Sequence, residues 1–405
     1  MSVDGEEEVM EATAAHAAFR RECRAWLEAN ARPRTDTAIS GVLRILGRAV
    51  DSATALAEAR AFQAKAAADG WAGIDWPTEY GGRGAGLMEQ VIWGQESAAF
   101  DVPTPIFMIG INMGGPTVIA HGTEEQKRRW LPPLRSGEEI WCQLFSEPGA
   151  GSDLASLRTS AERDGDAWVV RGQKVWSSGA HYSQWGLLLA RTDADAPKHR
   201  GITYFLLDMT SPGIEVRPLR QMTGAAHFNE VFLDDVRVPD HDRIGDMNDG
   251  WRVAQTTLLN ERASIADMLG EAEIVHALTR LACAADAEGR PGVADPRVRQ
   301  VIAQILIQSE IVRFIGQRIV TAIAHGRIPG AEASIVKLAM ARLLTFASDV
   351  GTRIGGPGAV AQPNAWWDLL LAAPALRIAG GSDEIQRNII GERVLGLPKE
   401  PAVTE

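Results

Sequence analysis

Residues 147–178 read EPGAGSDLASLRTSAERDGDAWVVRGQKVWSS, and this stretch decides the fold class of the chain. It begins with a loop of small residues that includes Gly149, Gly151 and Ser152, with Ser146 just before it. Glycines let the backbone approach a flat ligand closely and direct N–H groups at its polar edge. Taken alone, however, the loop is better interpreted as a plain Gly-rich turn between strands. It lacks the Gly-Lys-Ser/Thr end of a Walker motif and the βαβ surroundings of a dinucleotide-binding fingerprint.

The stretch belongs to a zone of short β-rich runs between about residues 141 and 242. Gly, Pro and Asp turns bound these runs, which is typical of a compact β-barrel or sandwich. The runs are WVVRGQKVWSS at 168–178, WGLLLART at 185–192, GITYFLLDM at 201–209, GIEVRPL at 213–219 and EVFLDDVRVP at 230–239.

Helical periodicity flanks this zone on both sides. Ala-rich amphipathic stretches precede it at 11–30, 52–69, 88–99 and 124–135, and long segments follow it at 249–287, 296–325 and 332–354, with a last helix from about 383. Short connections imply antiparallel neighbours in a bundle. The sequence therefore predicts a multidomain α+β chain, with an N-terminal α-helical domain (1–138), a central antiparallel β-barrel or sandwich (139–242) and a C-terminal four-helix-type bundle (243–405).

Composition argues against several classes of protein. The chain has 405 residues and a net charge of −11 without a Lys/Arg cluster, which argues against nucleic-acid and anionic-membrane partners. Cys23, Cys142 and Cys283 have no paired spacing, and no His/Cys/carboxylate set has metal-ligand spacing, so we expect neither a disulfide framework nor a metal. MSVDGEEEVM at the N-terminus lacks a signal pattern, and no apolar run is long enough to span a bilayer. We therefore expect a cytoplasmic protein.

Trp176 and Ser178 stand at the end of a β-rich run. Strand alternation would place both side chains on one face, where a Trp beside a hydroxyl could flank an isoalloxazine ring. A core Trp of the barrel is the better interpretation on this evidence alone, because large aromatic side chains usually pack inside.

Glu261 interrupts an apolar helical stripe. The stripe consists of Ala254, Leu258, Ile265, Met268 and Ala272 in the helix expected over 249–272. Glu261 lies three residues from Leu258 and four from Ile265, so it belongs to the stripe face. Desolvation there would raise the pKa of the carboxyl, which suits a general base acting on a weak carbon acid. A structural Glu paired with an Arg from another helix is an equally good interpretation; the adjacent Arg262 faces elsewhere.

The stretch AGGSD at 379–383 has no large side chain at Ala379, Gly380 or Gly381. Ser382 or Asp383 is a good N-cap for the helix that follows. The two glycines would expose backbone N–H groups, although a plain loop and cap also explains these residues.

Together these pieces resemble one family, the acyl-CoA dehydrogenases. The likeness covers nearly the whole chain, and the helical, β, helical order is also the family's order. The segments that carry it are GWAGIDWPTEYGGRG at 70–84, HGTEEQKRRWLPPLRSGE at 121–138, the opening stretch at 147–178, VFLDDVRVP at 231–239 and EIQRNIIGERVLGLP at 384–398.

The resemblance implies an enzyme that binds FAD between the β domain and the C-terminal bundle. It would oxidise an acyl-CoA thioester to the 2,3-enoyl form and pass electrons to an electron-transferring flavoprotein. A carboxylate removes the α proton while hydride passes from the β carbon to flavin N5. In the family, a flavin ribityl hydroxyl and a backbone N–H hold the thioester oxygen, and that N–H corresponds to Gly380.

Carried over by position, the resemblance implies flavin contacts from Gln143, Phe145, Ser146, Gly151, Ser152, Trp176, Ser178, Arg290, Gly355, Gly356, Ser382 and Glu384. It implies substrate contacts from Ser152, Leu258, Arg262, Ala379 and Gly381. Most members carry the base at the position of Gly380, and a minority carry it on the helix that matches 249–272. The resemblance therefore identifies Glu261 as the catalytic base and leaves Gly380 as the backbone donor.

Two departures from the family concern subunit contacts. GRPGVADPR at 289–297 replaces an Arg-x-x-Phe-Gly segment, with Arg290 as its remnant, and Thr352 replaces the Gln of a Gln-x-x-Gly-Gly turn. In the family, both segments reach a neighbouring subunit's flavin. We therefore expect either weak FAD binding across a homomeric interface or pairing with a different subunit, in a dimer or tetramer.

Ala379 and Gly380 leave room for a branched or bulky acyl chain, and a steroid side-chain thioester is one candidate substrate. Two other functions stay open. The chain could be a largely non-catalytic partner subunit, against which Glu261 and the EPGAGSD loop argue. It could also be an oxidase or monooxygenase on the same fold, against which its short length argues.

Overall fold

The computed structural model describes residues 3–34, 53–267, 271–284, 291–325, 331–361 and 364–399, with backbone alone for 3–13, 104, 262–267, 271–273 and 323–324. Contacts divide the chain into two compact units. The sheet unit comprises residues 47–86 and 102–264, and the helical unit comprises residues 1–46, 87–101 and 265–405. The three predicted domain ranges, which cut the chain differently, stay a prediction.

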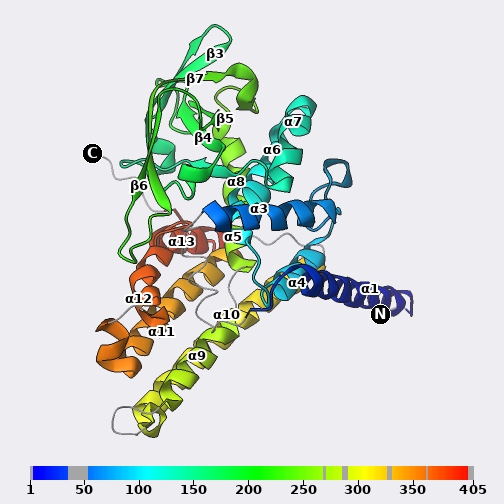
Figure 1. The fold of residues 1–405 in the computed structure, drawn as a ribbon, viewed down its shortest axis with the longest axis vertical. Helices are drawn as coiled ribbons and strands as arrows, with labels where there is room; N and C mark the ends of the chain where they lie inside the picture. Colours follow the sequence, from blue (N-terminus) through cyan, green and yellow to red (C-terminus); the bar gives the residue numbers. More distant parts are fainter. Residues whose placement is uncertain are drawn as a thin grey trace. The chain divides into compact units, whose positions relative to one another are not determined.

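One sheet organises the sheet unit, with its strands green to cyan in Figure 1. Its strands are β1 Trp141–Leu144, β2 Ser160–Asp164, β3 Ala167–Lys174, β4 Trp185–Arg191, β5 Ile202–Asp208, β6 Ile214–Leu219, β7 Phe228–Pro239 and β8 Arg243–Ile244. Their order is β6-β7-β3-β2-β4-β5-β8, with β1 on β4. Most pairs are antiparallel as expected, but β1 and β2 both pair with β4 in parallel. The middle residues of β4 are buried throughout, as a strand covered on both faces requires.

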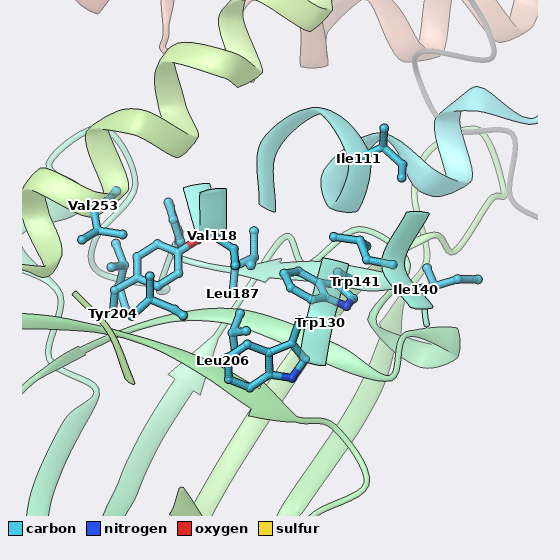
Figure 2. Close-up of a cluster of buried hydrophobic side chains, with 14 of the residues drawn as sticks. Ile111, Val118, Trp130, Ile140, Trp141, Leu187, Tyr204, Leu206 and Val253 are labelled. Carbon is cyan, nitrogen blue, oxygen red and sulfur yellow. The ribbon is translucent and has the colours of Figure 1, made fainter. Parts of the chain in front are cut away.

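Helices of the sheet unit pack on this sheet through one hydrophobic cluster. They are α3 Ala53–Ala68, α5 Thr104–Met108, a π-helix Ile109–Gly114, α6 Gly115–His121, α7 Glu124–Ser136 and most of α8 Gly250–Asp267. Figure 2 shows the cluster, in which Tyr204 of β5 lies beside Val253 of α8 and Val118 of α6. The cluster therefore ties α8 to the sheet.

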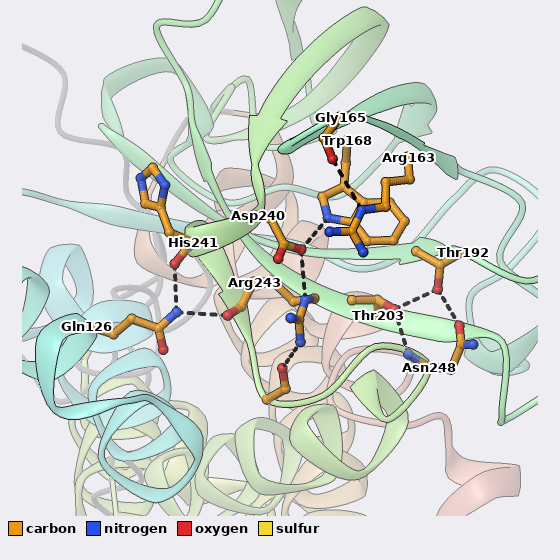
Figure 3. Close-up of polar contacts among 11 residues, drawn as sticks. Gln126, Arg163, Gly165, Trp168, Thr192, Thr203, Asp240, His241, Arg243 and Asn248 are labelled. Atoms are coloured by element: carbon orange, nitrogen blue, oxygen red, sulfur yellow. Dashed lines mark hydrogen bonds and ion pairs between the residues drawn. The ribbon is translucent and has the colours of Figure 1, made fainter.

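Polar contacts fix the start of α8 on β5 (Figure 3). The Asn248 N–H donates to Thr203 Oγ1 at 2.9 Å, and Thr192 Oγ1 donates to Asn248 Oδ1 at 2.6 Å. A Cβ on Gly250 would lie 2.5 Å from the backbone carbon of Thr203, so glycine permits this close approach. Nearby, Gln126 Nε2 donates to the carbonyls on either side of Asp242, which anchors the segment before α8 to α7.

A chain of buried hydroxyls fixes the middle of α8. Thr117 Oγ1 donates to the Met113 carbonyl at 2.7 Å and lies 2.9 Å from Thr257 Oγ1, which lies 3.2 Å from the Tyr204 hydroxyl. Since Thr117 has given its one proton to Met113, it accepts from Thr257, which in turn accepts from Tyr204. Burial raises the pKa of Tyr204, so the phenol stays a donor. The chain joins α8, α6 and β5 in one orientation.

The helical unit contains α1 Val3–Asn30, α4 Leu87–Ser97, α9 Glu271–Cys283, α10 Pro296–Ala324, α11 Glu332–Ala361, α12 Ala365–Leu376, α13 Asp383–Ile389 and a π-helix Ile390–Val394. Four of these, α9 to α12, share a hydrophobic cluster. Glu96 of α4, 4% exposed, binds Arg20 and Arg24 of α1 at 2.6 and 2.7 Å. Short 3-10 turns occur in both units, at Thr78–Tyr80, Leu154–Ser156, Ala180–Tyr182 and Asp240–Asp242 in the sheet unit and at Gly292–Ala294 in the helical unit.

The segment predicted at 249–287 contains α8 and α9, and residues 268–270 between them lie outside the described part. The helix α12 was not predicted, because AWWDLLLAAPAL is apolar except for Asp368 and therefore shows little helical period. Among the described helices, none is long and apolar enough to cross a membrane.

Candidate active site

A buried ion pair between Glu147 and Lys174 holds the loop after β1. Lys174 Nζ lies 2.9 Å from Glu147 Oε1 and donates to the Phe145 carbonyl at 3.1 Å. The two side chains are 9% and 0% exposed. The Glu147 carboxylate also accepts the N–H groups of Arg158 at 2.7 Å and Thr159 at 2.8 Å. One ammonium and one carboxylate thus join the end of β1, the loop, the approach to β2 and the end of β3.

Burial and pairing act in opposite directions on these two groups. Burial lowers the pKa of Lys174 to about 8, although the Glu147 carboxylate acts to raise it. Burial alone would raise the pKa of Glu147, but the Lys174 ammonium and the donors on Arg158 and Thr159 bring it below its usual value. The pair is therefore charged at neutral pH.

Beyond this pair the loop is open. A Cβ built on Gly149 or Gly151 would meet no atom within 4 Å. Ser152 is exposed and Ser146 is partly exposed, whereas the Phe145 ring is 4% exposed and packs in the core. The loop therefore offers free space and hydroxyls on its outer side, and Phe145 can offer a ligand its backbone but not its ring.

Trp176 differs from the sequence interpretation in its strand position and in its burial, while its contact with a flavin stays a prediction. Strand β3 ends at Lys174, and Trp176 adopts a left-handed φ of 62°, so strand alternation does not relate it to Ser178. Trp176 is also not a core residue, because it is 60% exposed and contacts the Phe228 ring edge-on with centroids 5.9 Å apart. Ser178 is partly buried.

Glu261 lies on α8, partly buried, in the same unit as the loop. Gln143 Nε2 on β1 donates to Glu261 Oε2 at 3.5 Å. Of the predicted apolar stripe, Ala254 is fully buried and Leu258 packs against the core, as expected. The side chains of Arg262, Ile265, Met268 and Ala272 lie outside the described residues. The stripe thus holds over the part of α8 that carries Glu261.

The AGGSD turn has a defined conformation in the helical unit. Gly380 and Gly381 have φ angles of 62° and 89°, in the region that favours glycine. Gln386 Nε2 donates to the carbonyls of Gly380 at 2.8 Å and Gly381 at 3.3 Å, and Lys337 Nζ donates to Gly381 at 2.7 Å. Ser382 is the N-cap of α13, as predicted. The turn is therefore held through its carbonyl groups.

Gly355 and Gly356 lie at a break in α11. Gly356 has φ 61° and ψ −154°, so the helix changes direction there. The Thr352 hydroxyl donates within its own helix, towards the carbonyls of Ser348 at 3.1 Å and Asp349 at 2.9 Å. The Thr352 hydroxyl therefore donates to carbonyls of its own helix, whereas a longer Gln side chain at this position could donate to groups outside the helix.

The other predicted residues are more dispersed. Ala379 is exposed, and Glu384 is exposed and paired with Arg387 at 3.0 Å. Arg290 lies outside the described residues. The sheet unit holds Gln143, Phe145, Ser146, Gly151, Ser152, Trp176, Ser178, Leu258 and Glu261, and the helical unit holds Gly355, Gly356, Ala379, Gly380, Gly381, Ser382 and Glu384.

Sequence reasoning missed the side chains that support these loops, namely Glu147, Lys174, Lys337 and Gln386. A signal existed for Lys174, because Trp168 and Val170 of β3 point inward and Lys174 continues that alternation. A lysine at an inward strand position needs a buried partner. No comparable signal marks Lys337 or Gln386, whose partners are backbone carbonyls distant in sequence.

Comparison with known proteins covers almost the whole chain. Models of the acyl-CoA dehydrogenase N-terminal, middle and C-terminal domains match residues 13–138, 142–236 and 248–395. Acyl-CoA dehydrogenase IpdE1 of Mycobacterium tuberculosis is 41% identical over 94% of this chain and 98% of its own. Acyl-CoA dehydrogenase FadE34 of the same organism is 42% identical over 89% of this chain, which spans about half (49%) of that longer protein.

Solved structures agree. A structure titled Tcur3481-Tcur3483 steroid ACAD has a TM-score of 0.79 at 28% identity, covering 96% of this chain and 98% of its own. The ChsE4-ChsE5 complex from Mycobacterium tuberculosis has a TM-score of 0.78 at 31% identity, covering 95% and 98%. The three domain models match in sequence order and include the loop, the exposed Trp176 and Glu261 of α8. The chain therefore belongs to the acyl-CoA dehydrogenase family of oxidoreductases.

Proposed function

We propose that this protein is an FAD-dependent dehydrogenase that converts an acyl-CoA thioester to its 2,3-enoyl form with Glu261 as the base. The observation that carries the proposal is the position of the Glu261 carboxylate. It lies on α8, a helix fixed by buried hydroxyls, and Gln143 Nε2 of β1 is 3.5 Å from it. Gly380, where most family members carry the base, has no side chain. A thioester α proton is a weak acid, so its removal needs a carboxylate and a donor for the enolate oxygen.

The residues of the sheet unit fit a flavin. Open space lies beside Gly149 and Gly151. Trp176, whose neighbour Val175 donates its N–H to the Ser146 carbonyl at 2.9 Å, exposes its ring. Gln143, Ser146, Gly151, Ser152, Trp176 and Ser178 would hold the cofactor there, and Gly355, Gly356, Ser382 and Glu384 are proposed to contact it from the helical unit. When bound, the flavin supplies a hydride acceptor. Electron-transferring flavoprotein is the proposed electron acceptor from this chain.

Within the proposed reaction, Glu261 takes the α proton onto its carboxylate. Gln143 holds that carboxylate through its amide donor. The Gly380 N–H donates to the thioester oxygen, where charge develops as the proton leaves. Leu258 and Arg262 on α8, Ser152 in the loop, and Ala379 and Gly381 in the turn are proposed to contact the acyl-CoA.

A branched or bulky acyl group, including a steroid side chain, is the proposed substrate class. Ala379, Gly380 and Gly381 have the smallest side chains or none, so they leave the most room for an acyl group beside this turn. The Tcur3481-Tcur3483 relative is titled a steroid ACAD. Linear acyl-CoAs would leave this space unfilled and bind less tightly, because buried apolar contact is lost.

The chain is proposed to work as an oligomer. Helix α10 exposes an apolar stripe of Ile307, Ile311 and Phe314, each half or more exposed in the single chain. Spacing of four and three residues places them on one face. Relatives described as ChsE4-ChsE5 and Tcur3481-Tcur3483 each contain two named chains, which favours pairing with a homologue. The partner-subunit function is the second candidate that this observation supports.

Anaerobic titration of the purified protein with linear, branched and steroid acyl-CoAs tests the proposal. We expect a yellow protein whose flavin absorbance bleaches at the lowest concentrations with the bulky substrates. A protein that gains neither FAD nor bleaching until it is co-expressed with a homologue would instead be a partner subunit. Rapid peroxide formation by the reduced flavin in air would indicate an oxidase.

Replacement of Trp176 by Ala is expected to weaken FAD binding about tenfold, because an exposed aromatic surface is lost. Trp176 is 60% exposed, so the melting temperature of the flavin-free protein should change little. Equilibrium dialysis with FAD measures the effect, and Trp176→Phe is the control that keeps an aromatic ring. Equal FAD affinity in wild type and Trp176→Ala would contradict the assignment.

A further inference from the structure

We propose that Lys337 and Gln386 are positioning residues that fix the Gly380–Gly381 turn and thereby the direction of the Gly380 N–H. The inference rests on the proposed function, in which that N–H donates to the thioester oxygen. It explains how a turn of two adjacent glycines can serve as a rigid donor.

The problem that these residues solve is flexibility. Two successive glycines have no Cβ to restrict φ and ψ, so a peptide flip within the turn costs little. An enolate donor must keep its direction before the charge develops, since reorganisation during the reaction costs free energy. The Gly380 N–H itself finds no acceptor among the described residues, and Gly380 is partly exposed. Its direction therefore depends on how the neighbouring peptide groups are held.

Those neighbouring groups are anchored on both sides of the Gly380 N–H. On one side, the Ala379 N–H donates to the Ala375 carbonyl at 2.8 Å, where α12 ends. On the other side, Gln386 Nε2 holds the Gly380 carbonyl at 2.8 Å, and Lys337 Nζ holds the Gly381 carbonyl at 2.7 Å. The peptide that carries the Gly380 N–H thus lies between two fixed peptide groups.

A second clamp closes the same turn at its base. The Asp383 N–H donates to the Arg377 carbonyl at 3.0 Å, and the Arg377 side chain binds Asp383 Oδ2 at 2.8 Å through Nε and 2.7 Å through Nη2. The two residues that enter and leave the turn are therefore joined by backbone and side chain. Lys337 and Gln386 act on the part of the turn that this clamp does not reach.

The buried Gln386 amide is oriented by its hydrogen bonds to the Gly380 and Gly381 carbonyls. Gln386 is 1% exposed, yet its Oε1 is buried and has no donor among the described residues. A buried polar atom without a partner costs free energy. The amide orientation is therefore set by its Nε2, which donates to both glycine carbonyls. Gly381 is fitted to this arrangement, since a Cβ there would lie 2.6 Å from Gln386 Nε2.

Three variants test the inference in the full-length holoenzyme. Gln386→Glu keeps the side-chain shape but presents a carboxylate to the two carbonyls, and Lys337→Met keeps most of the length without a donor. Gly381→Ala displaces Gln386 Nε2 and, at a φ of 89°, also strains the turn itself. Each should lower kcat about tenfold, because the donor is misdirected rather than lost. KM and FAD content should stay nearly unchanged in Gln386→Glu and Lys337→Met, whereas Gly381→Ala, at a proposed acyl-CoA contact, should raise KM as well. Lys337→Arg, which keeps a donor, should stay close to wild type.

A non-oxidisable acyl-CoA analogue with sulfur at C3 separates positioning from simple stability. Its bound enolate gives a long-wavelength absorption with oxidised flavin, so a pH titration of that band reports the α-proton pKa of the bound analogue. The three variants should shift the band's midpoint to higher pH by about one unit, which is the same tenfold effect. Lys65→Met and Gln95→Glu, both at exposed positions outside the turn, are the matched controls and should leave the midpoint unchanged.

The outcomes distinguish the two levels of the argument. If wild type forms the band and is bleached by substrate, but the folded variants match it in midpoint and kcat, the positioning role is wrong and the proposed function stands. If wild type itself shows neither band nor bleaching, the proposed function fails. Should one variant not fold, the other two act on the same carbonyls by different means and decide the question.

Discussion

Flavin reduction by substrate is expected to slow by a factor of about 10² to 10⁴ when Glu261 is replaced by Gln, the range that general acid–base catalysis supplies. The amide fills the same volume and can still contact Gln143, which lies 3.5 Å from the carboxylate, but it cannot accept the α proton. Anaerobic stopped-flow absorbance at the flavin band, with a bulky acyl-CoA, measures the rate.

FAD content and binding of the C3-thia analogue should stay close to wild type in Glu261→Gln, while the analogue's enolate band disappears. Glu125→Gln, an exposed Glu on α7, is the matched control and should react like wild type. Near wild-type bleaching by Glu261→Gln would show that another group is the base.

The second large effect concerns stability. Replacing Lys174 by Met leaves the Glu147 carboxylate, 9% exposed, without its ammonium partner. Breaking a buried ion pair in this way costs about 3–5 kcal/mol of unfolding free energy. Because the same residue holds the Phe145 carbonyl and the loop, FAD affinity should fall as well. Urea unfolding followed by circular dichroism measures the loss.

A double replacement, Lys174→Met with Glu147→Gln, separates charge from packing. It removes both buried charges and keeps similar volumes, so most of the lost stability should return. A double variant as unstable as Lys174→Met alone would mean that the pair's charges are not the cause.

The same pair gives a pH dependence whose direction follows from linkage. The pKa of Lys174 is about 8 in the folded protein and 10.5 when the side chain is exposed to water, so between these values the unfolded chain binds more protons. Lys174 therefore contributes stability that is fully present above the unfolded pKa and is lost as pH falls through about 8. Relative to the double variant, wild type should gain up to about 3 kcal/mol between pH 7.5 and pH 10.5. Parallel stability profiles of the two proteins would contradict the burial of a charged Lys174.

Much of the architecture could be predicted because periodicity is a local property. The runs at 185–192 and 201–209 became β4 and β5, and the stretches at 124–135 and 296–325 became α7 and α10. The parallel pairing of β1 and β2 with β4 depends on contacts distant in sequence, which no local pattern encodes. The helix α12 is apolar except for Asp368 and shows little helical period.

The candidate site divides in the same way. Glu261 stands out in the sequence because a carboxylate within an apolar stripe contradicts its local pattern. The structure places it partly buried on α8, 3.5 Å from Gln143, and its role as the base stays a prediction. Trp176 was placed wrongly, because alternation was extended past Lys174, where strand pairing ends and a left-handed residue resets the direction of the chain. The supports of the AGGSD turn, Lys337 and Gln386, donate to carbonyls and so leave no trace in residue type.

The hydroxyl chain through Thr257 also sets the direction in which the Glu261 side chain leaves α8. Every proton in that chain has one acceptor, so α8 cannot rotate about its axis without breaking a buried hydrogen bond. Thr257 and Glu261 are four residues apart, a little more than one turn. A carboxylate moved to position 260 or 262 would turn away by about 100°. The spacing Thr-x-x-x-Glu therefore keeps the proposed base on the face of α8 that the hydroxyl chain fixes.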